Sequence, residues 1–113
     1  MSTLQQRAQA HFLEKRERLV SVEVPEWGGR VYFHPAMSAR ERAAIWKYYG
    51  DGDNYGAILE SILVRALDEN GRRLFAEAAR DELRDRYDPD VLERISIEMG
   101  SFDEPMSADE KKS

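Results

Sequence analysis

The sequence predicts an α+β fold, namely a small, mostly α-helical single domain with one N-terminal β-hairpin and a disordered C-terminal tail. Apolar and polar residues alternate between residues 20 and 34 on both sides of a paired glycine, as in a hairpin. Before and after this stretch, apolar residues recur at helical spacing. After Gly100 the chain is polar and has no periodicity. Residues 1–100 are therefore assigned to one domain and residues 101–113 to a flexible polar tail.

A helix is expected over residues 3–18. Thr3 and Gln6 have the spacing of a capping box, in which the two side chains accept hydrogen bonds from each other's backbone N–H groups. Apolar residues such as Leu4 and Phe12 recur every four positions, so they form a stripe only one residue wide. Because so narrow a stripe buries little surface, we expect this helix to need a partner surface for its stability.

The hairpin is predicted from the stretch VEVPEWGGRVYFH, residues 22–34. Alternate valines share one side of the first strand, and Val31 and Phe33 share one side of the second. Pro25 can close the first strand because it has no N–H group to donate to the sheet. A phosphate-binding loop would need a helix N-terminus after its glycines, and here a strand follows. We therefore interpret the glycine pair as part of a turn.

A second helix is expected to start at a capping box formed by Ser38 and Glu41. The clearest helical pattern follows between Tyr55 and Leu67, and its broad apolar face is expected to form the centre of the core. We expect the stretch 68–71 to end this helix, with its Gly or Asn in the left-handed conformation that commonly follows a helix.

Two shorter helices complete the predicted domain. One is highly charged, covers about residues 77–86 and is anchored by Leu83. The other is capped by Asp88 and has Pro89 at its first position, where a missing N–H does no harm. The residues expected to be buried on this last helix are Val91, Leu92, Ile95 and Met99.

Composition excludes several classes of function. The net charge is −5, and the basic residues are interleaved with acidic ones, which argues against nucleic-acid binding because that needs clustered Lys and Arg. There is no cysteine, hence no disulfide framework or thiolate site. The N-terminal sequence lacks the continuous apolar core of a signal peptide, and no segment reaches the roughly 18 apolar residues of a membrane span. We expect a soluble, cytosolic protein.

No complete motif for catalysis, a metal or a cofactor is present. The stretch DGDNYG from Asp51 resembles the start of an EF-hand, but the position that requires a bidentate Glu is Ile62. His11 and His34 lie in different elements and show no zinc-binding spacing. No serine lies in a G-x-S-x-G context. The sequence therefore predicts a protein that is not an enzyme and needs no cofactor.

Aromatic residues are the best candidates for partner contacts. Trp27 is expected at the tip of the hairpin, where packing would rarely require so large a side chain. Trp46 and its neighbours on the second helix cannot all face one core, because successive residues step by 100° around a helix. Large aromatic side chains are favoured as interface anchors. The predicted partner-binding residues are Phe12, Trp27, Tyr32, Trp46 and Tyr49.

Four short motifs in this order resemble the tail assembly chaperones of long-tailed phages and prophages. The first is V-x-V-P-E-W-G-G at Val22–Gly29, and the second is the helix start at Ser38–Arg42, with its E-R pair. The third is D-x-x-G-x-x-L-F at Asp68–Phe75, and the fourth is the D-x-x-V-L pattern at Asp88–Leu92. The resemblance extends over roughly residues 10–100. It involves motifs of the fold and no catalytic residues.

This resemblance implies a non-enzymatic protein that binds the tape measure protein and helps recruit tail tube subunits in the host cytoplasm, and that is absent from the mature virion. Such chaperones are often made in a second, longer form by ribosomal frameshifting. We also expect this chain to associate with itself as a homo-oligomer. The consecutive Lys111 and Lys112 near the end of the chain are compatible with the A-rich sequence at which frameshifting occurs. The alternative from another class is a small acidic regulatory or inhibitory binding protein, which the net charge permits. A small-molecule enzyme is a third alternative, supported only by two histidines and scattered carboxylates.

Overall fold

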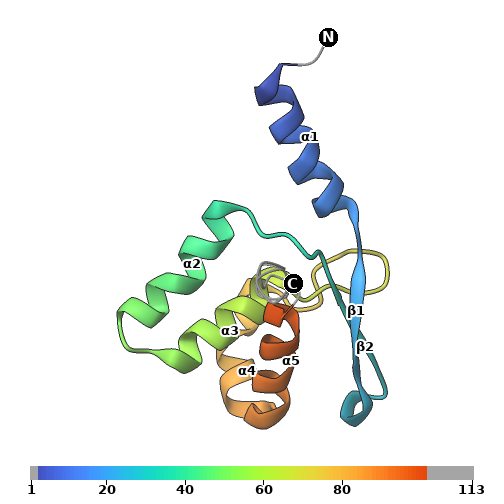
Figure 1. Ribbon diagram of the computed structural model, residues 1–113. Helices are drawn as coiled ribbons and strands as arrows, with labels where there is room; N and C mark the ends of the chain where they lie inside the picture. Colours follow the sequence, from blue (N-terminus) through green and yellow to red (C-terminus); the bar gives the residue numbers. More distant parts are fainter. Residues whose placement is uncertain (1–2, 102–113) are drawn as a thin grey trace, which may run out of the picture.

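A computed structural model describes residues 3–101 of the chain. It contains an N-terminal helix, a β-hairpin and a group of helices that packs beside the hairpin (Figure 1). The mostly helical α+β fold with one N-terminal hairpin is therefore confirmed. The flexible tail predicted for residues 101–113 lies outside the described residues except for Ser101, which is the last residue of a helix.

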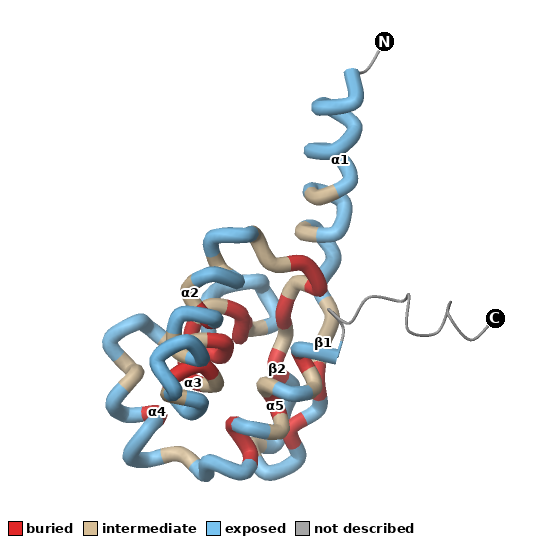
Figure 2. Tube along the Cα trace, turned by 60° about the vertical axis from the view of Figure 1, so that its left-hand side comes forward, coloured by how far each residue is buried: buried red, intermediate tan, exposed pale blue. Residues whose placement is uncertain are grey.

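The first helix, α1 (Leu4–Glu17), extends away from the rest of the molecule (Figure 1). Its predicted capping box is present, with Thr3 and Gln6 exchanging hydrogen bonds of 2.8 and 3.1 Å. None of its residues is buried, and the pale-blue tube in Figure 2 shows this along most of its length. The narrow apolar stripe thus covers no surface of the described residues 3–101, and we call α1 the N-terminal arm.

The hairpin consists of β1 (Val20–Val24) and β2 (Gly29–Phe33), which pair antiparallel with Val22 opposite Val31. A short 3-10 turn, η1 (Pro25–Trp27), connects them, and Gly28 follows it with φ 68°, in the left-handed region that favours glycine. The alternation predicted from the sequence is confirmed, because Val22, Val31 and Phe33 are buried. The apolar face of the hairpin therefore forms one wall of the core.

Two helices follow, α2 (Ala39–Gly50) and α3 (Asn54–Arg65). The predicted capping box at Ser38 is present at the start of α2. The stretch that resembles an EF-hand is a turn between the helices, and Asp53 caps α3 by accepting a 2.8 Å hydrogen bond from the Gly56 N–H. Because α3 carries most of the buried helical residues in the middle of the chain, its predicted place at the centre of the core is confirmed.

The end of α3 differs from the prediction. The helix stops at Arg65, and Leu67 is extended and exchanges backbone hydrogen bonds of 2.9 and 2.7 Å with Tyr32 of β2. Gly71 has a positive φ of 79°, but it belongs to a tight turn that brings Arg73 back beside Leu67. In the sequence, apolar residues recur at helical spacing up to Leu67. The backbone at Leu67 is nevertheless extended, because it pairs with the free edge of β2.

The remaining elements agree with their predictions. The charged segment forms η2 (Glu77–Ala79) and α4 (Arg80–Arg86), with Leu83 fully buried. The last helix, α5 (Pro89–Ser101), begins where the Asp88 carboxylate accepts a 2.9 Å hydrogen bond from the Asp90 N–H. The core cluster joins the hairpin to the helices and consists of Val22, Val24, Val31, Phe33, Leu59, Ile62, Leu63, Ala66, Leu83, Val91, Leu92, Ile95 and Met99.

Gly56→Ala should lower the free energy of unfolding by about 1–3 kcal/mol. An added Cβ would collide with the Tyr48 ring and the Asp53 carboxyl group, which is held as the cap of α3. Gly100→Ala in α5 is the matched control, because a Cβ there meets nothing within 4 Å and Ala favours a helix by up to about 1 kcal/mol. Urea unfolding followed by circular dichroism measures both, and equal stability of the two variants would contradict the prediction.

Candidate partner-binding surfaces

The aromatic residues predicted to contact partners do not gather at one place. Trp46 and Tyr49 on α2 are the most exposed, at 62% and 52%. Phe12 lies on the arm, while Trp27 and Tyr32 belong to the hairpin, and all three are half-buried. The structure therefore distributes these residues over three regions, and each region has its own geometry.

A groove of about 760 Å³ lies between α2, α3 and α5. Tyr49 of α2, Tyr55 and Ile58 of α3 and Ile97 of α5 contribute its large apolar side chains. Tyr55 and Ile97 were not among the predicted partner-binding residues, although they are 41% and 63% exposed. The sequence contained a signal for Ile97, because it is an apolar residue outside the buried stripe of its own helix.

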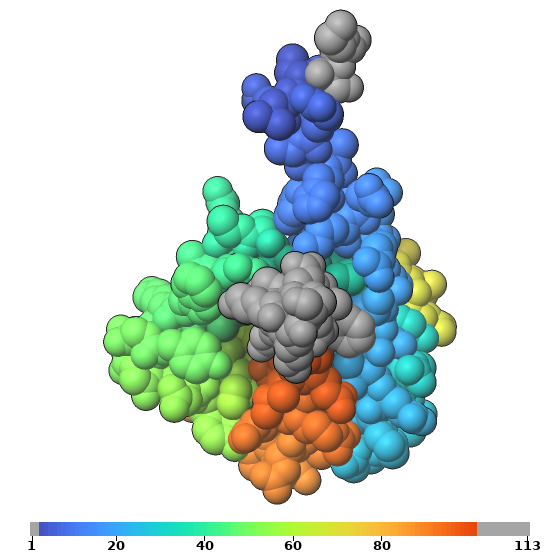
Figure 3. Space-filling view, viewed as in Figure 1, coloured from blue at the N-terminus to red at the C-terminus, as the bar shows by residue number. Residues whose placement is uncertain are grey.

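The arm carries a second apolar surface. Leu4 and Leu13 are 76% and 55% exposed, and Ala8 and Phe12 line a shallow patch together with Leu13. The guanidinium of Arg16 lies 5.9 Å from the centre of the Phe12 ring. The space-filling view shows the arm standing clear of the body of the molecule (Figure 3). Within residues 3–101 the apolar side chains of this helix thus remain exposed.

Trp27 occupies a packed position that the sequence did not reveal. Its ring makes edge-to-face contacts with Phe75 and Tyr87 at centroid distances of 6.3 and 5.7 Å, and those two rings lie 5.6 Å apart. This aromatic cluster packs against the core. The expectation that packing would not require Trp27 was wrong, because segments far along the chain supply its neighbours. A partner contact through its exposed edge stays a prediction.

An ion pair lies beside the aromatic cluster. Arg94 of α5 donates hydrogen bonds of 2.6 and 2.7 Å to the two carboxylate oxygens of Glu26 in the turn of the hairpin. These side-chain bonds are the main reason why the pKa of Glu26 is lowered to about 2. The pair ties the tip of the hairpin to α5 across the surface.

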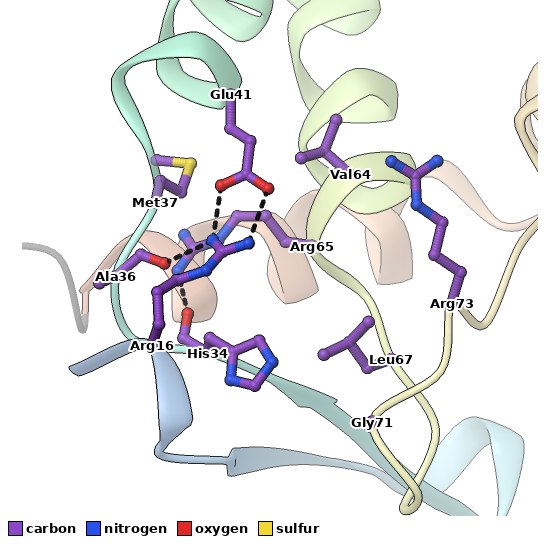
Figure 4. Close-up of a pocket in the computed structure, with 10 residues that line it drawn as sticks. All are labelled: Arg16, His34, Ala36, Met37, Glu41, Val64, Arg65, Leu67, Gly71 and Arg73. Carbon is purple, nitrogen blue, oxygen red and sulfur yellow. Dashed lines mark hydrogen bonds and ion pairs between the residues drawn. The ribbon is translucent and has the colours of Figure 1, made fainter. Parts of the chain in front are cut away.

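A cavity of about 300 Å³ lies where the arm meets the body (Figure 4). Arg16 is bonded there to Glu41 and to the carbonyl oxygen of Ala36. Arg65 is only 6% exposed, donates a 2.9 Å hydrogen bond to the carbonyl oxygen of His34 and lies over the Phe33 ring. Arg16 thus bonds to Glu41, and both Arg16 and Arg65 donate to backbone carbonyls at this cavity, so these side chains connect the segments around it.

One histidine contacts a backbone carbonyl group, and the other is exposed on the surface. His34 Nδ1 lies 2.7 Å from the carbonyl oxygen of Arg18, while His11 is exposed on the arm. Within residues 3–101, no group of three or more His, Cys, Asp or Glu side chains could hold a metal ion. Over the same residues, no helix is long and apolar enough to cross a membrane.

One solved structure establishes what kind of fold this is. The chain is similar to the tail assembly chaperone of bacteriophage HK97, with a TM-score of 0.64 and 17% sequence identity. The match covers 91% of this chain and 98% of that chain. No family model and no curated protein matches the sequence. The chain thus has the fold of a phage tail assembly chaperone, which confirms, at the level of the fold, the resemblance noted in its motifs.

Trp27→Ala should destabilise the protein by about 2 kcal/mol, because it removes the edge-to-face contacts with Phe75 and Tyr87 and leaves a cavity beside the core. Trp46→Ala is the control, since Trp46 is largely exposed and its loss should change stability by less than about 0.5 kcal/mol. Denaturant unfolding compares the two. If both variants unfold at the wild-type midpoint, the aromatic cluster contributes no stability.

Glu26 should make stability depend on pH in the acidic range. Its pKa is about 2 in the folded protein and near the ordinary value of 4.5 when unfolded, so the pair with Arg94 stabilises the fold fully above pH 4.5. That stabilisation is lost as the pH falls from 4.5 towards 2. The difference in melting temperature between wild type and Glu26→Gln should shrink over this interval. Adding Arg94→Gln to Glu26→Gln should not change the pH dependence further, and a difference that stays constant between pH 4.5 and pH 2 would contradict the assignment.

Proposed function

We propose that this chain is a non-enzymatic tail assembly chaperone that binds the tape measure protein and helps recruit tail tube subunits during tail morphogenesis. The observation that carries the proposal is the similarity of fold to the bacteriophage HK97 chaperone over nearly the whole of both chains. The four sequence motifs give separate support, because they rest on the identity and spacing of residues and not on the path of the backbone.

The exposed apolar surfaces suit a helical partner. An amphipathic helix binds by placing its apolar side chains in a groove, and the groove between α2, α3 and α5 presents Tyr49, Tyr55 and Ile97 for this purpose. The apolar patch on the arm, which includes Phe12 and Leu13, is a second surface of the same kind. A long helical protein such as a tape measure protein could occupy the two surfaces with successive segments.

The proposal includes self-association through the same exposed apolar surfaces. It also places the protein in the host cytoplasm during tail assembly. The protein is then absent from the mature virion. A monomer that exposes a helix without buried residues gains stability when another chain covers it. The proposal also includes a longer form of the protein made by ribosomal frameshifting.

Co-purification with the tape measure protein of the same phage or prophage tests this function. Wild type should retain helical fragments of that protein, whereas Ile97→Glu in the groove and Phe12→Glu on the arm should each weaken binding at least about tenfold by placing a charge in an apolar contact. Leu19→Glu is the matched control, because Leu19 is an exposed apolar residue that lines neither surface. Light scattering gives the mass of wild type alone and in the complex.

No binding of any fragment at tens of micromolar by wild type would overturn the proposal, and binding of a nuclease or polymerase in its place would favour the inhibitory protein. Equal binding by wild type and both variants would preserve the function but reject the two surfaces.

A further inference from the structure

The arm is joined to the body by very few contacts. No residue of α1 is buried. In the last turn of α1, the side chain of Arg16 donates hydrogen bonds to the body of the protein. The guanidinium donates to both carboxylate oxygens of Glu41, at 2.6 and 3.2 Å, and to the carbonyl oxygen of Ala36 at 3.1 Å (Figure 4). Three hydrogen bonds from one side chain thus connect a helix of 14 residues to the domain.

Glu41 has a second role that links the arm to α2. Its Oε1 atom also accepts a 2.9 Å hydrogen bond from the Ser38 N–H, and the Ser38 hydroxyl accepts one of 3.1 Å from the Glu41 N–H. These two bonds form the capping box at the start of α2. One carboxylate therefore holds the first turn of α2 and the last turn of α1 together.

The chain has a pivot just beyond the arm. Arg18 caps the C-terminus of α1, and its carbonyl oxygen lies 2.7 Å from Nδ1 of His34 at the end of β2. This contact fixes where the chain enters the hairpin. A rigid helix attached at one point can still swing, so its direction depends on a second attachment point, and Arg16 supplies that point.

The contact at Arg16 combines a specific geometry with partial exposure to water. A bidentate pair between Arg and a carboxylate is geometrically specific. The pKa of Glu41 reflects this contact, because partial burial would raise it but the hydrogen bonds from Arg16 and Ser38 outweigh burial and lower it. The side chains of Arg16 and Glu41 are nevertheless 33% and 24% exposed, so water can replace each partner.

We propose that Arg16 and Glu41 form an ionic latch that gives the N-terminal arm two states. In the latched state α1 points in one direction relative to α2, and in the free state it swings about the pivot at Arg18 while remaining helical. Arg16 is a positioning residue. The latch holds the arm in one orientation before a partner binds, so binding costs less conformational entropy of the arm.

Distance measurements between spin labels test the latch in the full chain. The protein has no cysteine, so Gln9→Cys on the arm and Asp85→Cys on α4 place the two labels at unique thiols. The wild-type background should give one narrow distance distribution. Arg16→Ala should broaden it at least about twofold, whereas Lys15→Ala, the adjacent exposed cation, should leave it narrow.

Glu41→Gln separates the two roles of Glu41. Gln also serves as the third helical residue of a capping box, so the start of α2 should persist while the ion pair is lost. Glu41→Gln should therefore broaden the distance distribution, though less than Arg16→Ala because the bond from Arg16 to the Ala36 carbonyl remains, with hydrogen exchange in the first turn of α2 unchanged. Because α1 buries nothing, both variants should unfold within about two degrees of wild type.

Three results would overturn the latch. One is a narrow distribution in Arg16→Ala, and another is a wild-type distribution that is already as broad as that of the variant. The third is broadening that occurs only together with loss of the cooperative unfolding transition, because that would show unfolding in place of release. These measurements use the isolated chain, so they do not depend on whether it binds a tape measure protein.

Discussion

The packing of the hairpin's apolar face against α3 and α5 is the interaction on which the rest of the structure depends. A two-stranded hairpin alone is marginally stable in water, and short isolated helices are marginal as well. Val22, Val31 and Phe33 share one core cluster with residues of α3 and α5, so strands and helices stabilise each other. At the free edge of β2, the backbone of Leu67 exchanges hydrogen bonds with that of Tyr32 and satisfies groups that would otherwise lie unpaired beside the core.

The packing of the hairpin against α3 and α5 leaves some apolar surface outside the core. Arg65, buried at the end of α3, donates to backbone carbonyls of His34 and Met99 and thereby closes one end of the core with satisfied polar groups. The arm and the groove at Tyr49, Tyr55 and Ile97 receive no such cover from residues 3–101. The packed core thus holds these exposed apolar side chains at fixed places on the surface.

The candidate surfaces were only partly predictable. Helical geometry indicated that the aromatic residues of α2 could not all be buried, and the exposure of Trp46 and Tyr49 agrees with this. The groove could not be predicted because Tyr55 and Ile97 come from helices whose relative placement no local pattern specifies. Trp27 was misjudged for the same reason, since Phe75 and Tyr87 reach it only after the chain has folded.

The sequence by itself determined the local features: the helix starts at Thr3 and Ser38, the two alternating strands, and the buried stripe of α5. Capping bonds and apolar periods act between residues at most a few positions apart, so they can be read in order along the chain. Only the tertiary structure decided that α3 stops at Arg65, that the arm stays exposed beside the rest of residues 3–101 and that Arg16 meets Glu41. Those outcomes depend on contacts between residues far apart in the chain, and the packing of the whole core brings such residues together.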